Sequence, residues 1–267
     1  MTRVLVTGGT GVLGQRIAQQ LRARHATVVT LSRRAPAAPT PGLEWVPGDL
    51  ITGAGLDEAL CGVQAVVHAA TSQRAREDVQ MTQRLLDAAV RAKVEHLLYV
   101  SIVGIDHLSY FDYYAAKLEG ERRVAASGVP YSVQRATQFH DFVAYLLGRM
   151  NRFPVLTLPR RIRLQPVDPD AVAARIAYAT LNGVAGRLPD LAGPEAQSLE
   201  TLAHAWLRAM GQRKRTWSVP MPLPIFRAMA VGDLAPAHAV RIGPSWEAWL
   251  AATVAGPGRA AADGAFP

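Results

Sequence analysis

The chain has 267 residues, 49% of them hydrophobic, and a formal net charge of +8, which suits one large α/β domain with or without a small appended lobe. The single cysteine, Cys61, excludes intrachain disulfides, and no apolar run reaches the roughly 18 residues that span a bilayer, so we expect a cytoplasmic protein with no metal and no membrane partner. The densest basic groups, 160–163 and 213–215, lack interleaved aromatics, and we expect no nucleic-acid partner.

The chain opens with an apolar segment, 3–7, that runs into three spaced glycines, Gly8, Gly11 and Gly14. The segment 11–24 has apolar residues four apart, which predicts a helix that begins at the glycines and directs the positive end of its dipole toward an anion. A strand, a glycine turn and a helix in this order are typical of a pyrophosphate site. The alternative is a loop that merely needs positive φ angles.

A second predicted strand, 27–31, ends in Ser32-Arg33-Arg34. In a dinucleotide site an acidic residue at this place binds the adenosine ribose hydroxyls, whereas arginine pairs with a 2′-phosphate. Arg33 and Arg34 therefore favour NADP(H) over NAD(H). The alternative is that both are ordinary surface arginines at the start of the proline-rich loop 35–41.

Two further predicted strands are each followed by a short segment of interest. A third predicted strand, 43–47, leads to Gly48-Asp49-Leu50, and a fourth, 65–68, leads to Ala69-Ala70-Thr71. Small side chains after the fourth strand leave room for a cofactor across the strand ends. We expect His68, the last residue of that strand, to be a packed histidine rather than a catalyst.

The fifth predicted strand, 96–101, ends with Ser101, at the edge where open α/β sheets bind ligands. Twelve residues later, Tyr113 and Lys117 lie four apart on a predicted helix and so share a face. An ammonium beside the phenol favours its ionised form, which makes Tyr113 a better proton shuttle.

The alternation of strands and helices continues to about residue 190 and predicts an α/β fold with a Rossmann-type doubly wound parallel sheet. We expect a dinucleotide-binding core over 1–150, a smaller C-terminal substrate-side lobe over 151–255 that is interleaved with the core, and a disordered tail over 256–267. The later region includes a predicted helix, 169–181, and a predicted strand, 187–192. Aromatic residues after a sixth predicted strand, 131–135, either line a substrate pocket or pack a helix.

The glycine turn, Arg33, Gly48-Asp49-Leu50, Ser101 and Tyr113-x-x-x-Lys117 together resemble the short-chain dehydrogenase/reductase superfamily, in its atypical extended, NmrA-like branch, over about residues 1–210. The chain departs from extended members in its single serine after the fifth strand and its shorter Ser–Tyr spacing. The resemblance implies that Ser101 orients a substrate carbonyl, Tyr113 exchanges a proton and Lys117 holds the nicotinamide ribose. The expected cofactor-binding residues are Thr7, Gly8, Gly11, Val12, Leu13, Gly14, Arg33, Arg34, Asp49, Leu50, Ala69, Ala70, Thr71 and Lys117.

The sequence therefore predicts an NADP(H)-dependent oxidoreductase that moves a hydride to or from a small carbonyl, enone or quinone. One alternative is an NmrA-like redox sensor that binds NADP(H) without turnover and passes its occupancy to a protein partner. A nucleotide-sugar epimerase is less favoured, because such enzymes usually have an acidic residue where Arg33 stands. The partner we expect is a small-molecule substrate, and a homodimer stays open.

Overall fold

The computed structural model describes residues 1–35, 38–72, 74–220 and 234–255. Their contacts define two compact units. Unit 1 combines Met1–Arg135 with Ala173–Pro189, and unit 2 combines Ala136–Val172 with the described residues from Asp190 onward. The tail predicted at 256–267 lies outside the described residues.

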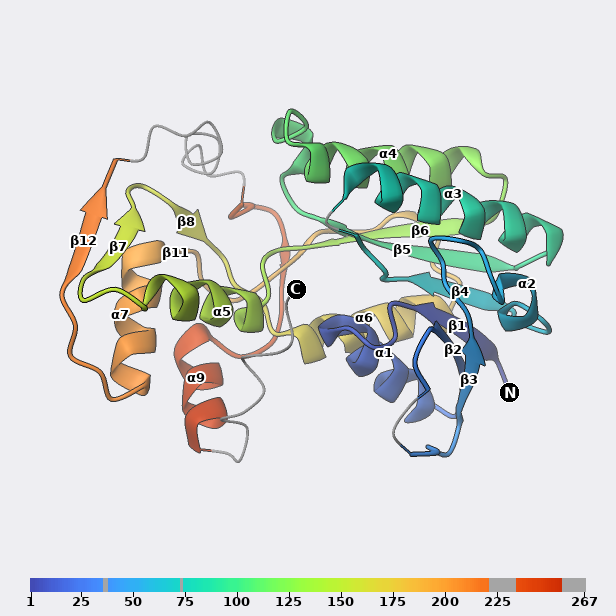
Figure 1. Cartoon of the computed structure of the whole chain (residues 1–267), viewed down its shortest axis with the longest axis horizontal. Coiled ribbons are helices and arrows are strands. Elements are labelled where there is room, and N and C mark those ends of the chain that lie inside the picture. The colour runs from blue at the N-terminus through green and yellow to red at the C-terminus, as the bar shows by residue number, and fades with distance from the viewer. Residues whose placement is uncertain (36–37, 73, 221–233, 256–267) are drawn as a thin grey trace. The chain divides into compact units, whose positions relative to one another are not determined.

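The first strand of the chain, β1, lies in the middle of the sheet of unit 1 (Figure 1). Its strand order is β6-β5-β4-β1-β2-β3, and β1 pairs in parallel with both β2 and β4, β2 with β3, and β4 with β5. The chain moves first to one edge and then to the other, which confirms the predicted doubly wound Rossmann-type fold. The strands are β1 (Arg3–Thr7), β2 (Thr27–Ser32), β3 (Leu43–Pro47), β4 (Ala65–His68), β5 (His96–Ile102) and β6 (Tyr131–Ala136).

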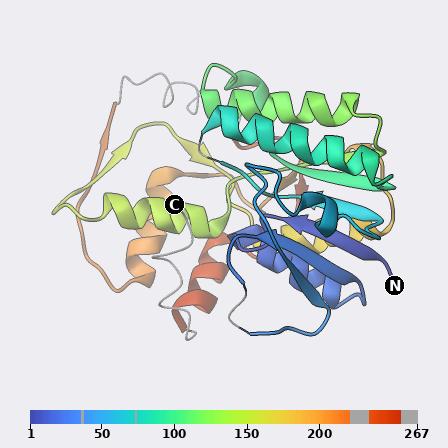
Figure 2. The same cartoon turned by 45° about the vertical axis from the view of Figure 1, so that its right-hand side comes forward.

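Helices cover both faces of this sheet. In Figures 1 and 2, α3 (Ala75–Arg91) and α4 (Asp112–Ala126) lie on one face, and α1 (Val12–Arg22) and α6 (Pro169–Leu181) lie on the other. Because both faces are covered, the strands are apolar on both sides, and Val4, Leu5 and Val6 of β1 are fully buried. Two short helices, α2 (Leu56–Ala59) and the 3₁₀ turn η1 (Ile105–His107), complete the connections.

Unit 2 is built from helices and short strands. The strands pair as β7 with β12 in parallel, β8 with β11 in antiparallel and β10 with β13 in parallel. Trp246 is buried, and its indole N–H donates to the Leu202 oxygen at 3.0 Å, which joins α9 (Trp246–Ala255) to α7 (Leu199–Ala209). The elements are α5 (His140–Met150), β7 (Leu156–Pro159), β8 (Arg163–Leu164), β10 (Leu191–Ala192), β11 (Gln197–Ser198), α7 (Leu199–Ala209), β12 (Thr216–Val219), β13 (Val240–Arg241) and α9 (Trp246–Ala255).

The single strand predicted over 187–192 is wrong. The chain forms two short strands there, β9 (Gly186–Arg187) and β10, both beside β6. Arg187 pairs with Val133, but Leu191 pairs with Ala136, so one extra residue lies between the two pairings. Pro189 falls in this interval and has no N–H to donate to a neighbouring strand, which explains the break.

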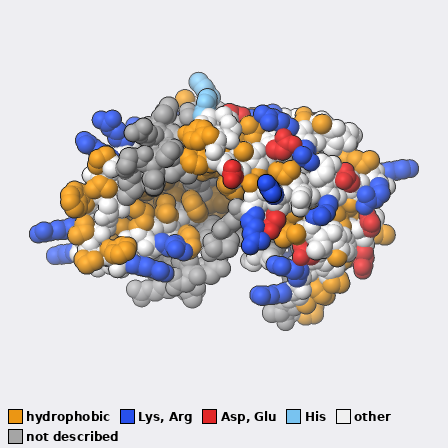
Figure 3. Space-filling view, turned by 45° about the horizontal axis from the view of Figure 1, so that its top comes forward, with side chains coloured by type: hydrophobic (Ala, Val, Ile, Leu, Met, Phe, Trp, Pro, Cys, Tyr) orange, Lys and Arg blue, Asp and Glu red, His pale blue; other side chains and the backbone are white. Residues whose placement is uncertain are grey.

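Charged side chains on the displayed face of unit 1, the right half of Figure 3, include both signs, with Asp and Glu between Lys and Arg. Within the described ranges, no helix has the length and apolar character needed to cross a membrane. The same residues place no group of three or more His, Cys, Asp or Glu where it could hold a metal ion.

Candidate functional site

The glycine turn between β1 and α1 is closely packed. Gly8 has a φ of +71°, and a Cβ there would lie 2.7 Å from the amide nitrogen of Ala70. The N–H of Gly11 donates to the Gly8 oxygen at 2.9 Å, and a Cβ on Gly14 would collide with that same oxygen. Gly8 and Gly14 are therefore required by the local backbone packing, whereas Gly11 has a φ of −82° and a Cβ there would lie 3.3 Å from the Gly8 oxygen.

Helix α1 begins at Val12, directly after the glycine turn. The N-cap Gly11 offers no side-chain cap, and the first turn contains no acidic residue. The positive end of the helix dipole can therefore receive a phosphate group. Leu13 and Leu50, two of the predicted binding residues, are each only 8% exposed.

The loop after β4 lies directly against this turn. Ala69 and Ala70 are half-buried, Thr71 is exposed, and the Ala70 N–H donates to the Thr7 hydroxyl at 3.4 Å. The structure thus brings Thr7, Gly8 and Ala70 together, three residues from two neighbouring strand ends. Such a pair of ends is where Rossmann-type sheets hold a dinucleotide.

His68 is packed, as predicted, and its hydrogen bonds fix its tautomer. The Thr82 hydroxyl donates to the Asp78 backbone oxygen, so at 3.0 Å it accepts from His68 Nε2–H. The other ring nitrogen, Nδ1, then accepts from the Thr7 hydroxyl at 2.7 Å. Burial, with a smaller contribution from the Lys117 charge, lowers the His68 pKa to about 3. A neutral imidazole therefore links β1, β4 and α3.

This imidazole predicts a specific loss of stability in acid. The unfolded chain binds a proton on His68 below pH 6.5, whereas the folded protein does so only near pH 3. The contribution is complete above the unfolded pKa and is lost as the pH falls toward the folded one. Between about pH 6 and 4, we expect the unfolding free energy of wild type to fall more steeply than that of His68→Gln, by about 1.4 kcal/mol per pH unit. Urea unfolding across this range measures both slopes, and equal slopes would contradict a neutral His68.

The three predicted catalytic residues come from β5 and α4. Ser101 is 3% exposed, and its Oγ has no hydrogen-bond partner among the described residues. It lies two residues after Tyr99, so both side chains point to the same face of the sheet. That face is the one under α4, because a Cβ on Gly120 of α4 would collide with the Tyr99 hydroxyl. Ser101 therefore faces the helix that carries Tyr113 and Lys117.

Lys117 is buried, 4% exposed, and lies among groups that favour its charged form. Its Nζ is 3.8 Å from Asp78 Oδ2 and 5.2 Å from the centroid of the Tyr99 ring. Burial acts to lower the Lys117 pKa, but Tyr99, Asp78 and Tyr113 outweigh it, and the net pKa is raised. The structure thus places a charged ammonium within electrostatic range of Tyr113.

Sequence reasoning missed the partners that hold α4 in place. Arg135 of β6 is 3% exposed and binds Glu121 of α4 through two hydrogen bonds of 2.6 Å, and it also pairs with Asp106 of η1. Asp78 was missed as well. Its only sequence signal is an acid on the apolar face of α3, at helical spacing from Thr82 and Leu85.

The two arginines after β2 lie in different surroundings. Arg33 is exposed, and its guanidinium is 3.9 Å from Asp49 Oδ2, while Asp49 Oδ1 accepts the Ile51 N–H at 2.8 Å. Arg34 lines a groove on unit 1 and is held locally by the Ser32 hydroxyl, which donates to its backbone oxygen at 2.6 Å. The structure therefore joins Arg33 to the predicted adenine neighbour Asp49 and leaves Arg34 in the groove.

Comparisons with known proteins agree with this geometry. The family model for NAD(P)H-binding domains matches residues 8–148. A (4-alkanoyl-5-oxo-2,5-dihydrofuran-3-yl)methyl phosphate reductase of Streptomyces griseus is 30% identical over 218 residues, which are 79% of this chain and 75% of that protein.

Among solved structures, the triphenylmethane reductase of a Citrobacter species superposes with a TM-score of 0.80 at 18% identity, over 95% of this chain and 99% of that chain. An NADPH-dependent quinone oxidoreductase of Escherichia coli gives 0.76 at 19% identity, over 94% and 98%. These two likenesses show the fold, whereas the family match covers more than half of the chain. The chain therefore belongs to the NAD(P)H-binding family, within the superfamily of Rossmann-type reductases and epimerases.

Proposed function

We propose that this protein is an NADP(H)-dependent oxidoreductase of the NmrA-like branch, active in the cytoplasm, which transfers a hydride to or from a small carbonyl, enone or quinone. The observation that carries the proposal is that Lys117 is buried four residues after Tyr113 on α4, with its Nζ 3.8 Å from Asp78 Oδ2. Ser101, with an unpartnered buried Oγ, faces the same helix. The Streptomyces griseus relative is named as a reductase, which supports a redox reaction over binding alone.

The residues of unit 1 fit a dinucleotide. A side chain at Gly8 would strike the Ala70 backbone, so the glycine turn and the loop after β4 lie directly against each other, at a pair of strand ends of the kind where Rossmann-type sheets hold a dinucleotide. The uncapped start of α1 faces the same turn and suits the pyrophosphate. Gly8, Gly11 and Gly14 would hold the pyrophosphate, Asp49 would neighbour the adenine, and Lys117 would hold the nicotinamide ribose.

The chemistry divides between the cofactor and three side chains. When bound, the dinucleotide supplies or accepts a hydride at nicotinamide C4. Ser101 Oγ donates a hydrogen bond to the substrate oxygen and fixes its direction. In reduction, Tyr113 gives its phenolic proton to that oxygen while the carbon gains the hydride, and in oxidation it takes the proton back. The Lys117 ammonium stabilises the phenolate that remains on Tyr113.

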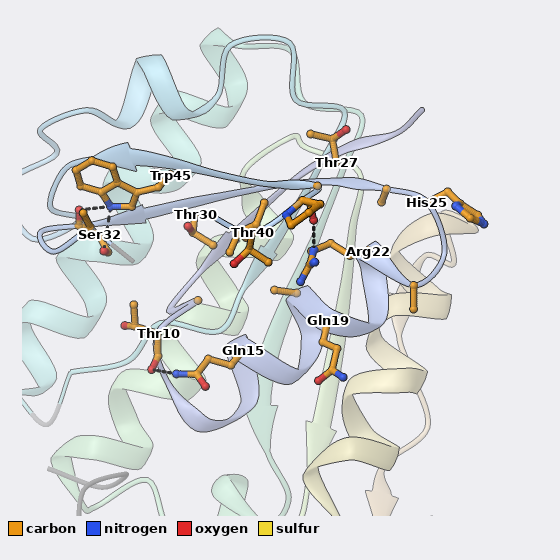
Figure 4. A pocket seen from close by; sticks show the side chains of 18 of the residues that line it. Thr10, Gln15, Gln19, Arg22, His25, Thr27, Thr30, Ser32, Thr40 and Trp45 are labelled. Atoms are coloured by element: carbon orange, nitrogen blue, oxygen red, sulfur yellow. Dashed lines mark hydrogen bonds between the residues drawn. The ribbon is translucent and has the colours of Figure 1, made fainter. Parts of the chain in front are cut away.

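The groove beside α1 supports a preference for NADP(H). It has a volume of about 920 Å³ and is lined by α1, β2 and β3. Figure 4 shows Thr10 of the glycine turn and Ser32 at the end of β2 toward one end of the groove, away from His25. Arg34 lines the groove as well, so a 2′-phosphate placed there would meet hydroxyl groups and a guanidinium but no carboxylate.

We therefore expect the Arg34 side chain to determine the preference. Arg34→Ala should weaken NADPH binding by about tenfold to a hundredfold and leave NADH binding unchanged, because a charge-assisted hydrogen bond to the 2′-phosphate contributes about 1.5–3 kcal/mol. Arg33→Ala, the matched control, should weaken both dinucleotides to a similar degree, since Arg33 is paired with Asp49. Calorimetric titration of each variant with each dinucleotide measures this. Equal affinity of wild type for NADPH and NADH would contradict the preference.

Turnover itself separates an oxidoreductase from a sensor. We expect steady oxidation of NADPH when the protein is mixed with at least one member of a panel of quinones, aldehydes and enones. A sensor has no chemical need for the set of Ser101, Tyr113 and Lys117. Tight NADPH binding with no oxidation across the whole panel would favour the sensor.

A further inference from the structure

Asp78 is a buried carboxylate on α3 that the proposed mechanism leaves without a role. It is 1% exposed, and its two oxygens face different elements. Oδ1 accepts the N–H of Ser72, in the loop that follows β4, at 2.7 Å. Oδ2 has no hydrogen-bond partner among the described residues and lies 3.8 Å from Lys117 Nζ on α4. One side chain therefore touches two elements that border the dinucleotide site.

Each element packed around Lys117 contributes one group. These are Asp78 from α3, Tyr99 from β5, Tyr113 from α4 itself and the neutral His68 from β4. Of these, Asp78 is the carboxylate, and a carboxylate at this distance offsets the cost of holding an ammonium away from water.

We propose that Asp78 is a positioning residue whose one oxygen holds the loop after β4 while the other keeps the Lys117 ammonium in place beside Tyr113. This inference rests on the proposed function for its link to catalysis, but the contact between Asp78 and Lys117 can be tested alone. It predicts that Lys117 stays protonated throughout the working range of pH because Asp78 carries a charge. The pKa of Lys117 is raised, in agreement with this expectation, although burial acts to lower it.

One substitution separates the charge of Asp78 from its hydrogen bond, and a second serves as its control. In Asp78→Asn the amide oxygen still accepts the Ser72 N–H, but the charge is lost and an NH₂ group faces Lys117. Glu77→Gln is the matched control. Glu77 accepts from the Ser72 hydroxyl at 2.9 Å and pairs with Arg74, so it contacts the same loop.

The chain has three lysines, Lys93, Lys117 and Lys214, so lysine labelled with ¹³C at Cε gives a spectrum simple enough to assign. Lys93→Arg and Lys214→Arg identify the other two signals. In wild type and Glu77→Gln we expect the Lys117 signal to titrate above its ordinary value of 10.5. In Asp78→Asn its midpoint should fall by about one to three pH units, because the nearby opposite charge is gone.

Two outcomes would overturn the proposal. One is a Lys117 midpoint that is the same in wild type and Asp78→Asn. The other is a wild-type Lys117 that titrates below its ordinary value. This measurement needs no variant, so it still tests the proposal if Asp78→Asn does not fold. In steady-state kinetics we expect Asp78→Asn to lower kcat about tenfold or more, with a smaller change in the KM for NADPH. If the titrations agree with the proposal but no substrate is turned over, the proposed function fails while the contact stands.

Discussion

Replacing Tyr113 by Phe should reduce turnover by about 10²- to 10⁴-fold, the usual contribution of a positioned proton donor. The ring would keep its place, because Tyr113 packs edge-on against Tyr114 with centroids 5.5 Å apart and the change removes one oxygen. We expect the NADPH affinity to change by no more than about twofold, since the phenol donates its proton to substrate and not to the cofactor. Steady-state kinetics and calorimetry on the same preparation measure both quantities.

Tyr114→Phe is the matched control for this variant. Tyr114 is the next residue on α4 and also carries a phenol, with edge-on contacts to Phe111 and Tyr113. It lies outside the face shared by Tyr113 and Lys117, so its loss should leave turnover within about twofold of wild type. Full activity in Tyr113→Phe would remove Tyr113 from the mechanism, and equal losses in both variants would point to packing instead of proton transfer.

Replacing Arg135 by Met should lower the free energy of unfolding by about 3 kcal/mol, because removal of one partner leaves a buried charge uncompensated. The Arg135 side chain is 3% exposed and Glu121 is 12% exposed, so Glu121 would be left in a poorly solvated place. The same ion pairs hold η1 and α4 to β6, and through α4 they hold Tyr113 and Lys117. Denaturant unfolding followed by circular dichroism measures the loss.

Arg122→Met is the control for that prediction. Arg122 also lies on α4 and pairs with a glutamate, Glu119, but its side chain is 69% exposed and the contact is 3.9 Å. Exposed pairs of this kind contribute little, so we expect a change within about 0.5 kcal/mol. If both variants lost a similar amount of unfolding free energy, the burial of the ion pairs that Arg135 makes with Glu121 and Asp106 would not be what stabilises α4.

The sequence predicted those parts of the site that depend on neighbours along the chain. The glycine turn, the strand ends at Ser32 and Ser101, and the helical spacing of Tyr113 and Lys117 are local patterns, and the structure has the predicted strands and helices around them. The parallel sheet also followed from the alternation of elements.

The sequence did not predict the contacts that depend on tertiary packing. Asp78 and Lys117 are far apart in the chain and meet because α3 and α4 lie side by side on one face of the sheet. Arg135 meets Glu121 and Asp106 for the same kind of reason. The strand predicted at 187–192 failed because Pro189 and one extra residue interrupt its pairing with β6, and the residue pattern of a single segment does not reveal register.

Hydride transfer is the central claim, and isotope transfer tests it most directly. The protein is incubated with NADPH that carries deuterium at the transferred position of nicotinamide C4, together with an aldehyde from the panel, and the alcohol is analysed by mass spectrometry. The proposed function predicts one deuterium on the carbinol carbon, because that carbon receives the hydride while Tyr113 supplies only the exchangeable proton. An alcohol without deuterium, or no oxidation of NADPH by any member of the panel despite tight NADPH binding, would contradict it.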